Sequence, residues 1–307
     1  MQEKIPVVVI VGPTASGKTA LGVEVARLLD SEVISADSMQ VYSSMPIASA
    51  APTDEETKGV KHHLVGFLSA HEKFSVAEFI NAATSVAKDI AERGKVPVLV
   101  GGTGLYIDSL LKGITFSDED CEEVRAALEQ EAQEKGTGAL FRRLREVDPD
   151  TAERLHLNDR KRIIRALEVY MLHGKTMTEV NKESLEQGSR FQPLIIGINY
   201  RDREKLYERI NKRVDIMLDN GLLEEAKAAF CSGVGNTAVQ AIGHKELFPY
   251  FEGSMSLAEA IENLKQATRR YAKRQLTWFR RNENINWIYA DETDDVLGSA
   301  KEILKKL

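Results

Sequence analysis

Apolar and polar positions follow two different patterns along the first third of the chain. Continuous apolar runs at 7–11 and 96–100 have the length of strands that are buried on both faces. After residue 18 and after residue 75, apolar residues instead recur at helical spacing, and the second helix opens with Ser75 and Glu78, the pair that forms a capping box. This order predicts an α/β fold, with a parallel sheet core flanked by helices.

The pattern changes in the middle of the chain. Between residues 116 and 192, charged helical segments follow one another with no strand-like apolar run. Strand character returns at 194–198 and again at 286–290. We therefore expect a catalytic core formed by residues 1–115 and 193–307, and a mostly helical insertion domain formed by residues 116–192.

Composition narrows the possible partners. The chain has 307 residues, 43% of them hydrophobic, which is ordinary for a soluble, well-packed protein. Its net charge of −6 gives no general attraction to nucleic acid, so RNA binding would need a local basic patch. Cys121 and Cys231 form no C-x-x-C motif, which suits a reducing compartment. The first apolar run is too short for a signal sequence or a membrane span, so we expect a cytoplasmic protein without a membrane partner.

A glycine-rich loop lies between the first predicted strand and the first predicted helix, which is the setting of a phosphate-binding P-loop. Its glycines let successive backbone N–H groups point into one concavity, a lysine adds a cation, and the last threonine offers a hydroxyl to Mg²⁺. The alternative is a glycine turn in an ordinary βα unit. The residues expected to bind phosphate are Gly12, Thr14, Ala15, Ser16, Gly17, Lys18 and Thr19.

Two further polar residues follow predicted strands, at the edge of the sheet where ligands bind in parallel α/β folds. Asp37 follows the predicted strand 31–36, so it either faces the ligand of Lys18 or caps a turn. The run 96–100 ends in two glycines and Thr103. Because nucleotide hydrolases usually place an aspartate there, this ending argues against ordinary ATP or GTP hydrolysis. Thr103 could bind substrate or cap the next helix.

Three segments are rich in basic residues. The run 160–165 has four, and such a run is usually a solvated helix face. The stretch 268–281 has six, together with three aromatic residues and no acid, which favours contact with RNA. The helix expected near 202–218 has basic residues that could reach a bound phosphate, and the sequence does not select among Arg203, Arg209, Lys212 and Arg213.

The histidines give weaker signals. Adjacent residues such as His62 and His63 point in different directions on a helix or a strand, and no Cys, Asp or Glu stands at ligand spacing, so we expect no metal site there. His244 stands alone, which is more typical of a structural or surface histidine than of a base.

Together these motifs resemble one family. The stretches 12–19, 37–42, 101–106 and 158–168, supported by 271–275, resemble bacterial tRNA dimethylallyltransferases in order and over nearly the whole chain. The resemblance implies transfer of a dimethylallyl group from dimethylallyl diphosphate to N6 of the adenosine immediately 3′ of the anticodon in tRNA. Such a reaction needs the base turned out of its stack and the departing diphosphate neutralised.

The resemblance also implies roles for residues. The glycine loop would bind the diphosphate with Mg²⁺ at Thr19, Asp37 would accept the proton of the attacking amine, and Thr103 would orient that amine or its base. A monomer suffices for this site. By likeness, the tRNA contacts are Asp37, Ser38, Met39, Gln40, Thr103, Arg125, Lys161, Arg162, Ile163, Ile164, Arg165, Gln240, Ala241, Ile242, Gly243, His244 and Lys245.

The chain departs from the family pattern at four positions. The pattern usually has a basic residue at Ser43, a lysine near Ala51, an acid at Gly66 and a tyrosine at His244. These departures concern tRNA contacts more than the reaction.

Three alternative functions remain: a P-loop kinase of a small metabolite, a prenyltransferase of free adenine nucleotides, and an RNA-binding protein without chemistry. The first two leave the basic segments unexplained, and the third makes Asp37 dispensable.

Overall fold

The computed structural model describes residues 4–114, 116, 121–233 and 238–307. Two compact units are formed, one by Met1–Leu111 with Arg190–Leu307 and the other by Lys112–Ser189. Residue 115, at the expected domain boundary, lies outside the described residues. No helix in the described ranges is both long enough and apolar enough to cross a membrane.

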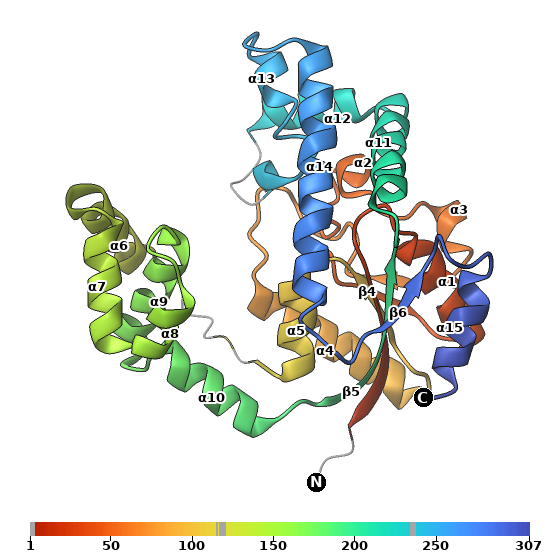
Figure 1. Cartoon of the computed structure of the whole chain (residues 1–307), viewed down its shortest axis with the longest axis horizontal. Coiled ribbons are helices and arrows are strands. Elements are labelled where there is room, and N and C mark those ends of the chain that lie inside the picture. Colours follow the sequence, from red (N-terminus) through yellow and green to blue (C-terminus); the bar gives the residue numbers. More distant parts are fainter. Residues whose placement is uncertain (1–3, 115, 117–120, 234–237) are drawn as a thin grey trace. The chain divides into compact units, whose positions relative to one another are not determined.

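The core unit is built on a parallel sheet, as the sequence predicts. In the described residues this sheet has six strands in the order β3-β2-β4-β1-β5-β6, and every pairing is parallel. Figure 1 shows the sheet with helices on its faces. The strands are β1 (Ile5–Val11), β2 (Val33–Ser35), β3 (His62–His63), β4 (Val98–Gly101), β5 (Phe191–Asn199) and β6 (Asn286–Tyr289).

Alternate residues of the central strands face opposite helical layers. Val9 and its neighbours on one face pack against α4 (Val76–Glu92) and α5 (Gly104–Lys112). Val8 and its neighbours on the other face pack against α1 (Lys18–Leu28) and α15 (Val296–Leu304). The capping box predicted at the start of α4 is confirmed, since the side chain before α4 accepts from the N3 backbone and the N3 glutamate bonds back.

The remaining helices of the core unit lie in two segments. Two short helices stand between β2 and β3, where the sequence predicts a connection with short turns. The others follow β5 and include one long helix, α14. These elements are α2 (Pro46–Ser49), α3 (Asp54–Thr57), α11 (Arg203–Asp219), α12 (Leu222–Ser232), the 3₁₀ turn η1 (Ala238–Gln240), α13 (Phe248–Phe251) and α14 (Leu257–Phe279).

Register brings the carboxyl ends of three strands together. Val11 of β1 pairs with Gly101 of β4, and Ser35 of β2 pairs with Val100 of the same strand. The loops that follow β1, β2 and β4 therefore leave the sheet side by side. This is the edge at which open parallel sheets bind ligands.

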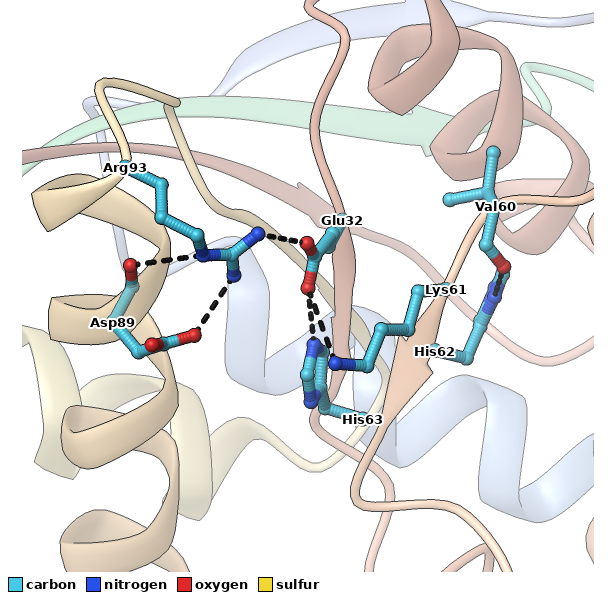
Figure 2. A network of polar contacts seen from close by, with 7 residues as sticks. All are labelled: Glu32, Val60, Lys61, His62, His63, Asp89 and Arg93. Atoms are coloured by element: carbon cyan, nitrogen blue, oxygen red, sulfur yellow. Dashed lines mark hydrogen bonds and ion pairs between the residues drawn. The ribbon is translucent and has the colours of Figure 1, made fainter.

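A network of charges fixes the edge strand β3 (Figure 2). Glu32, just before β2, accepts hydrogen bonds from Arg93 and from His63 Nε2, the latter at 2.6 Å, while Lys61 Nζ lies 3.9 Å away. Arg93 also bonds the Asp89 carboxylate of α4 at 2.8 Å. Hydrogen bonding from Arg93 is the largest of the effects that lower the pKa of Glu32 to about 2. This network ties a two-residue strand to both β2 and α4.

The second unit is helical, as predicted for the insertion. Its helices are α6 (Glu122–Lys135), α7 (Thr137–Val147), α8 (Pro149–Arg154), α9 (Arg160–His173) and α10 (Met177–Gln187). They enclose a core of their own that includes Leu128, Leu140, Leu144 and Leu167. Buried Asp148 accepts hydrogen bonds from the backbone N–H groups of Thr151 and Thr178, and so joins the starts of α8 and α10.

Candidate active site

The glycine loop between β1 and α1 has the backbone shape of an anion-binding site. Ala15 has φ +62° and Gly17 has φ +94°, both in the left-handed region, so the chain turns sharply before α1 begins at Lys18. A Cβ on Gly12 would lie 2.6 Å from the Ile198 carbonyl oxygen, so only glycine fits there. The hydroxyl of buried Ser16 has no hydrogen-bond partner among the described residues. An unpaired buried donor of this kind suits an oxygen-rich ligand.

Two arginines of α11 join Lys18 at this loop. Arg209 Nε donates to the Ala15 carbonyl oxygen at 3.0 Å. Arg213 lies one helical turn later on the same face. Burial first and Arg213 second lower the pKa of Lys18 to about 8, which leaves the lysine mostly protonated at neutral pH. Of the basic residues that the sequence could not separate, the structure therefore places Arg209 and Arg213 beside the loop.

Asp37 faces the same cations. Its Oδ1 accepts a hydrogen bond from the Met39 N–H at 2.9 Å, so the residue shapes the turn after β2 as well as facing the loop. Its carboxylate favours the charged forms of Lys18 and Arg213, against the burial that lowers both pKa values. The turn interpretation of Asp37 is confirmed by this bond, and the carboxylate faces the cations of the loop, whereas its role towards a bound ligand stays a prediction.

Thr103 ties the end of β4 to the Asp37 turn. Its hydroxyl oxygen accepts a hydrogen bond from the Ser38 N–H at 3.0 Å, and its own N–H donates to the Ala36 carbonyl oxygen at 3.2 Å. Helix α5 begins at the next residue, Gly104. Thr103 and Asp37 are therefore parts of one hydrogen-bonded turn, although they are 66 positions apart in the sequence.

Helix α14 contributes polar groups that the sequence interpretation missed. Gln275 bonds the Thr14 N–H and the Gly102 carbonyl oxygen, and Tyr271 lies one turn earlier. Burial raises the pKa of Tyr271, and Asp37 raises it further, while hydrogen bonds with Thr103 and Gln275 oppose the change. A signal was present, since Gln275 falls on the buried stripe that also holds Leu264, Thr268, Ala272 and Phe279. A polar residue on an apolar stripe calls for a partner.

A cavity of about 20 Å³ lies where these loops meet. Its lining includes Lys18, Thr19, Asp37, Gln40 and His62. This volume is close to what one water molecule or small ion needs. In the described ranges, no group of three or more His, Cys, Asp or Glu side chains could hold a metal ion. Mg²⁺ usually keeps several waters and binds through one or two protein oxygens together with phosphates, so the oxygens of Thr19 and Asp37 fit it.

Two arginines of the helical unit share one buried acid. Arg125 and Arg165 both bond Glu168, which is fully buried, at 3.0 and 3.1 Å. Lys161 and Arg162 are exposed at the start of α9. The expected tRNA contacts at Ile163 and Ile164 need correction as far as their side chains are concerned, because both are buried in the core of this unit (0% and 2% exposed).

The turn at 240–245 is only partly accessible. Gln240 and Lys245 are exposed, whereas Ala241 and His244 are buried. His244 Nε2 bonds Glu225 Oε1 at 2.9 Å, and the two oxygens of Glu225 also accept hydrogen bonds from the first N–H groups of α2. The buried His244 side chain therefore supports the turn and cannot itself reach tRNA in this conformation.

Comparison with known proteins extends over both compact units. The IPP transferase family profile matches residues 40–282. The chain is 48% identical to the tRNA dimethylallyltransferase of Acetivibrio thermocellus, over 98% of this chain and 96% of that protein. Its identity to the enzyme of the same name from Bacillus subtilis is 44%, over 98% of this chain and 96% of that protein.

Two solved structures of transferases that act on tRNA are also similar to this chain over nearly its whole length. The crystal structure of tRNA delta(2)-isopentenylpyrophosphate transferase from Staphylococcus epidermidis is 41% identical over 99% of this chain and 100% of that chain, with a TM-score of 0.72. A eukaryotic dimethylallyltransferase acting on tRNA is 29% identical, over 97% of this chain and 78% of that chain, with a TM-score of 0.80.

Proposed function

This chain belongs to the IPP transferase family and is a tRNA-modifying prenyltransferase, and we propose that it transfers a dimethylallyl group from dimethylallyl diphosphate to N6 of the adenosine 3′-adjacent to the anticodon. The observation that most supports this proposal is the hydrogen bond from the Ser38 N–H to Thr103 Oγ1. It holds the turn of Asp37 at the cavity that Lys18 also lines. A phosphate-binding group and an acceptor for a proton therefore meet at one place.

The donor would bind through its diphosphate to the loop 12–19. Backbone N–H groups, the unpaired Ser16 hydroxyl and the cations Lys18, Arg209 and Arg213 would contact its oxygens. Most of the catalytic gain should come from these groups, because negative charge grows on the diphosphate as it departs. Mg²⁺ held at Thr19, with the Asp37 carboxylate nearby, would supply further charge neutralisation.

The transfer itself is a displacement at C1 of the dimethylallyl group. The N6–C1 bond forms as the C1–O bond breaks, and the bonding electron pair leaves with the diphosphate. Asp37 accepts the proton that N6 loses, and Thr103 orients the amine. The adenosine must leave its stack to bring N6 to Asp37, so local unstacking of the anticodon loop is part of the reaction.

The tRNA would be held by exposed basic groups and by the turn after β2 that carries Asp37 and lines the cavity. Lys161 and Arg162 are exposed on α9, and Lys245 is exposed after η1. Contacts of this kind with the RNA backbone fix orientation without reading sequence.

We propose a monomer as the active form, because one chain supplies both groups of the site. These are the diphosphate loop, residues 12–19, and the turn after β2 that carries Asp37, here called the acceptor turn. A tRNA substrate is also the basis for proposing a cytoplasmic location.

The test is transfer of label from radiolabelled dimethylallyl diphosphate, with Mg²⁺, to an anticodon stem-loop that has adenosine 3′ of the anticodon. AMP and ATP serve as competing acceptors. We expect label on N6 of that adenosine. Label on the free nucleotides would instead support a nucleotide prenyltransferase, and no transfer to any acceptor would contradict the proposal and favour a kinase or a binding protein.

A further inference from the structure

Gln275 of α14 bridges two turns that are far apart in the sequence. Its side chain is buried, and Oε1 accepts a hydrogen bond from the Thr14 N–H of the phosphate loop at 2.8 Å. Its Nε2 donates to the Gly102 carbonyl oxygen, beside Thr103, at 3.0 Å. A carboxamide carries no charge and offers both an acceptor and a donor on one rigid plane. The phosphate loop is thus joined through a single amide to Gly102, the residue that follows β4 and precedes Thr103.

Two glycines allow this close approach. A Cβ on Gly102 would lie 2.1 Å from Gln275 Nε2, and a Cβ on Gly104 would lie 2.3 Å from the Trp278 ring. Real Cβ atoms do not approach other atoms so closely, so α14 packs directly on the backbone of the turn. The side chains of Gln275 and Trp278 therefore lie directly against the backbone of the turn.

Tyr271 lies beside this bridge, one turn before Gln275 on α14. Thr103, Gln275 and Asp37 all act on the pKa of its hydroxyl, which is therefore close to them. Next to Gly102, Thr103 accepts a hydrogen bond from the N–H of the residue after Asp37. The bonds of Gln275 and Thr103 therefore connect the Thr14 N–H to the Asp37 turn through the backbone of residues 102–103. Buried networks of this kind are rigid when every member is satisfied.

We propose that Gln275 is a positioning residue that holds the diphosphate loop and the acceptor turn at the separation the displacement requires. The inference rests on the proposed function. Displacement is efficient only when the reacting atoms are held about 3 to 3.5 Å apart and aligned. Gln275 touches neither reacting atom, and it acts through Thr14 on the side of the leaving group and through Gly102 on the side of the amine.

A purely structural role is the competing explanation, and matched variants separate the two. Gln275→Leu removes both hydrogen bonds, and Tyr271→Phe removes a buried hydroxyl of the same helix whose pKa depends on Gln275 and Thr103. Thr268→Val is the matched control, because Thr268 is also a buried polar residue of α14 but bonds only the Leu264 carbonyl oxygen of its own helix. Thermal unfolding of each variant reports the structural cost.

We expect Gln275→Leu to lower kcat by about 10- to 100-fold, the usual cost of misplacing reacting groups by about 1 Å. Affinity for the stem-loop, measured without donor, should change by less than about threefold, since Lys161 and Arg162 are untouched. Tyr271→Phe should lower kcat in the same direction, and the two changes combined should cost less than the product of their separate effects. Thr268→Val should leave kcat unchanged.

A second measurement does not depend on transfer. In calorimetric titration with inorganic diphosphate and Mg²⁺, Gln275→Glu should bind at least about tenfold more weakly, because a carboxylate beside the loop repels the anion. Gln266→Glu, at an exposed glutamine of the same helix, is the control. The inference is wrong if both Gln275 variants keep wild-type kcat and diphosphate affinity, or if Thr268→Val lowers kcat as much at an equal loss of stability. An inactive wild-type chain would instead contradict the proposed function.

Discussion

Replacing Glu32 by glutamine should destabilise the core unit in a pH-dependent way. The side chain is 12% exposed and lies among Arg93, His63 and Lys61. Its pKa falls from 4.5 to about 2, with hydrogen bonding from Arg93 as the largest cause. Each pKa unit corresponds to about 1.4 kcal/mol, so the charged form contributes roughly 3 kcal/mol to folding. Glu32→Gln removes that contribution and leaves Arg93, Lys61 and His63 without their shared carboxylate.

The sign follows from the direction of the pKa change. Because the folded-state pKa lies below the unfolded value, the contribution is complete above about pH 5 and is lost as the pH falls towards 2. The difference in unfolding free energy between wild type and variant should therefore be about 3 kcal/mol at pH 6 and shrink steadily on acidification. Urea unfolding followed by tryptophan fluorescence measures it, since both tryptophans, Trp278 and Trp287, belong to the core unit.

The control is Glu292→Gln, which removes an exposed partner of Arg201. Its side chain is 50% exposed, so the change should cost less than about 0.5 kcal/mol at any pH. If Glu32→Gln instead lowers the free energy of unfolding by the same amount at pH 3 as at pH 6, the residues in Figure 2 stabilise the sheet by packing and not by charge. That result would refute the reasoning from the pKa.

Substitutions at three further positions test the site and the turn at 240–245. Asp37→Ala should lower kcat by at least about 100-fold, the usual contribution of a general base, while stem-loop binding in a filter assay stays within a few-fold of wild type. Full turnover would remove the base assignment. Arg213→Met should raise both the KM for dimethylallyl diphosphate and the pKa of Lys18, because a neighbouring like charge is lost. The second effect can be followed through the pH dependence of amine labelling, and an unchanged profile would show that Arg213 does not act on Lys18. His244→Phe should lower the melting temperature through the buried carboxylate of Glu225, at a cost of about 1–3 kcal/mol, whereas His244→Tyr should lose less if its hydroxyl reaches the same carboxylate. Equal losses in the two variants would contradict this account.

The sequence predicted those parts of the site that depend on local patterns. A strand, a glycine loop and a helix in succession are sufficient to place Lys18 and Thr19. Asp37 and Thr103 were predicted to share an edge because parallel strands end on the same side. The choice of Arg209 and Arg213 depends instead on how α11 packs, and spacing along one helix cannot show which face meets the loop.

Burial limits two groups of tRNA contacts that were assigned by likeness. The side chains of Ile163 and Ile164 are buried, since apolar residues within a charged helix usually mark its buried side. The His244 side chain is bonded to Glu225 of α12, a partner that the sequence around 240–245 does not reveal. The importance of Gln275 depends on contacts with Thr14 and Gly102, which are 261 and 173 positions away in the sequence. The buried stripe of α14 marks Gln275 as a polar residue that needs a partner, but the sequence gives no sign of which residues those partners are.

The pairing of β1 with β5 constrains when this site can form during synthesis. Val8 pairs with Leu194, which emerges from the ribosome 186 residues later. Protein synthesis proceeds at about 5–20 residues per second, so β5 becomes available to pair with β1 roughly 10–40 s after β1 has been made. The helical unit Lys112–Ser189 is continuous and can fold within that interval. The nascent core must therefore shield an apolar strand that pairs with β4 on one side and is still open on the other, and slower translation of the insertion should raise the yield of aggregated chains.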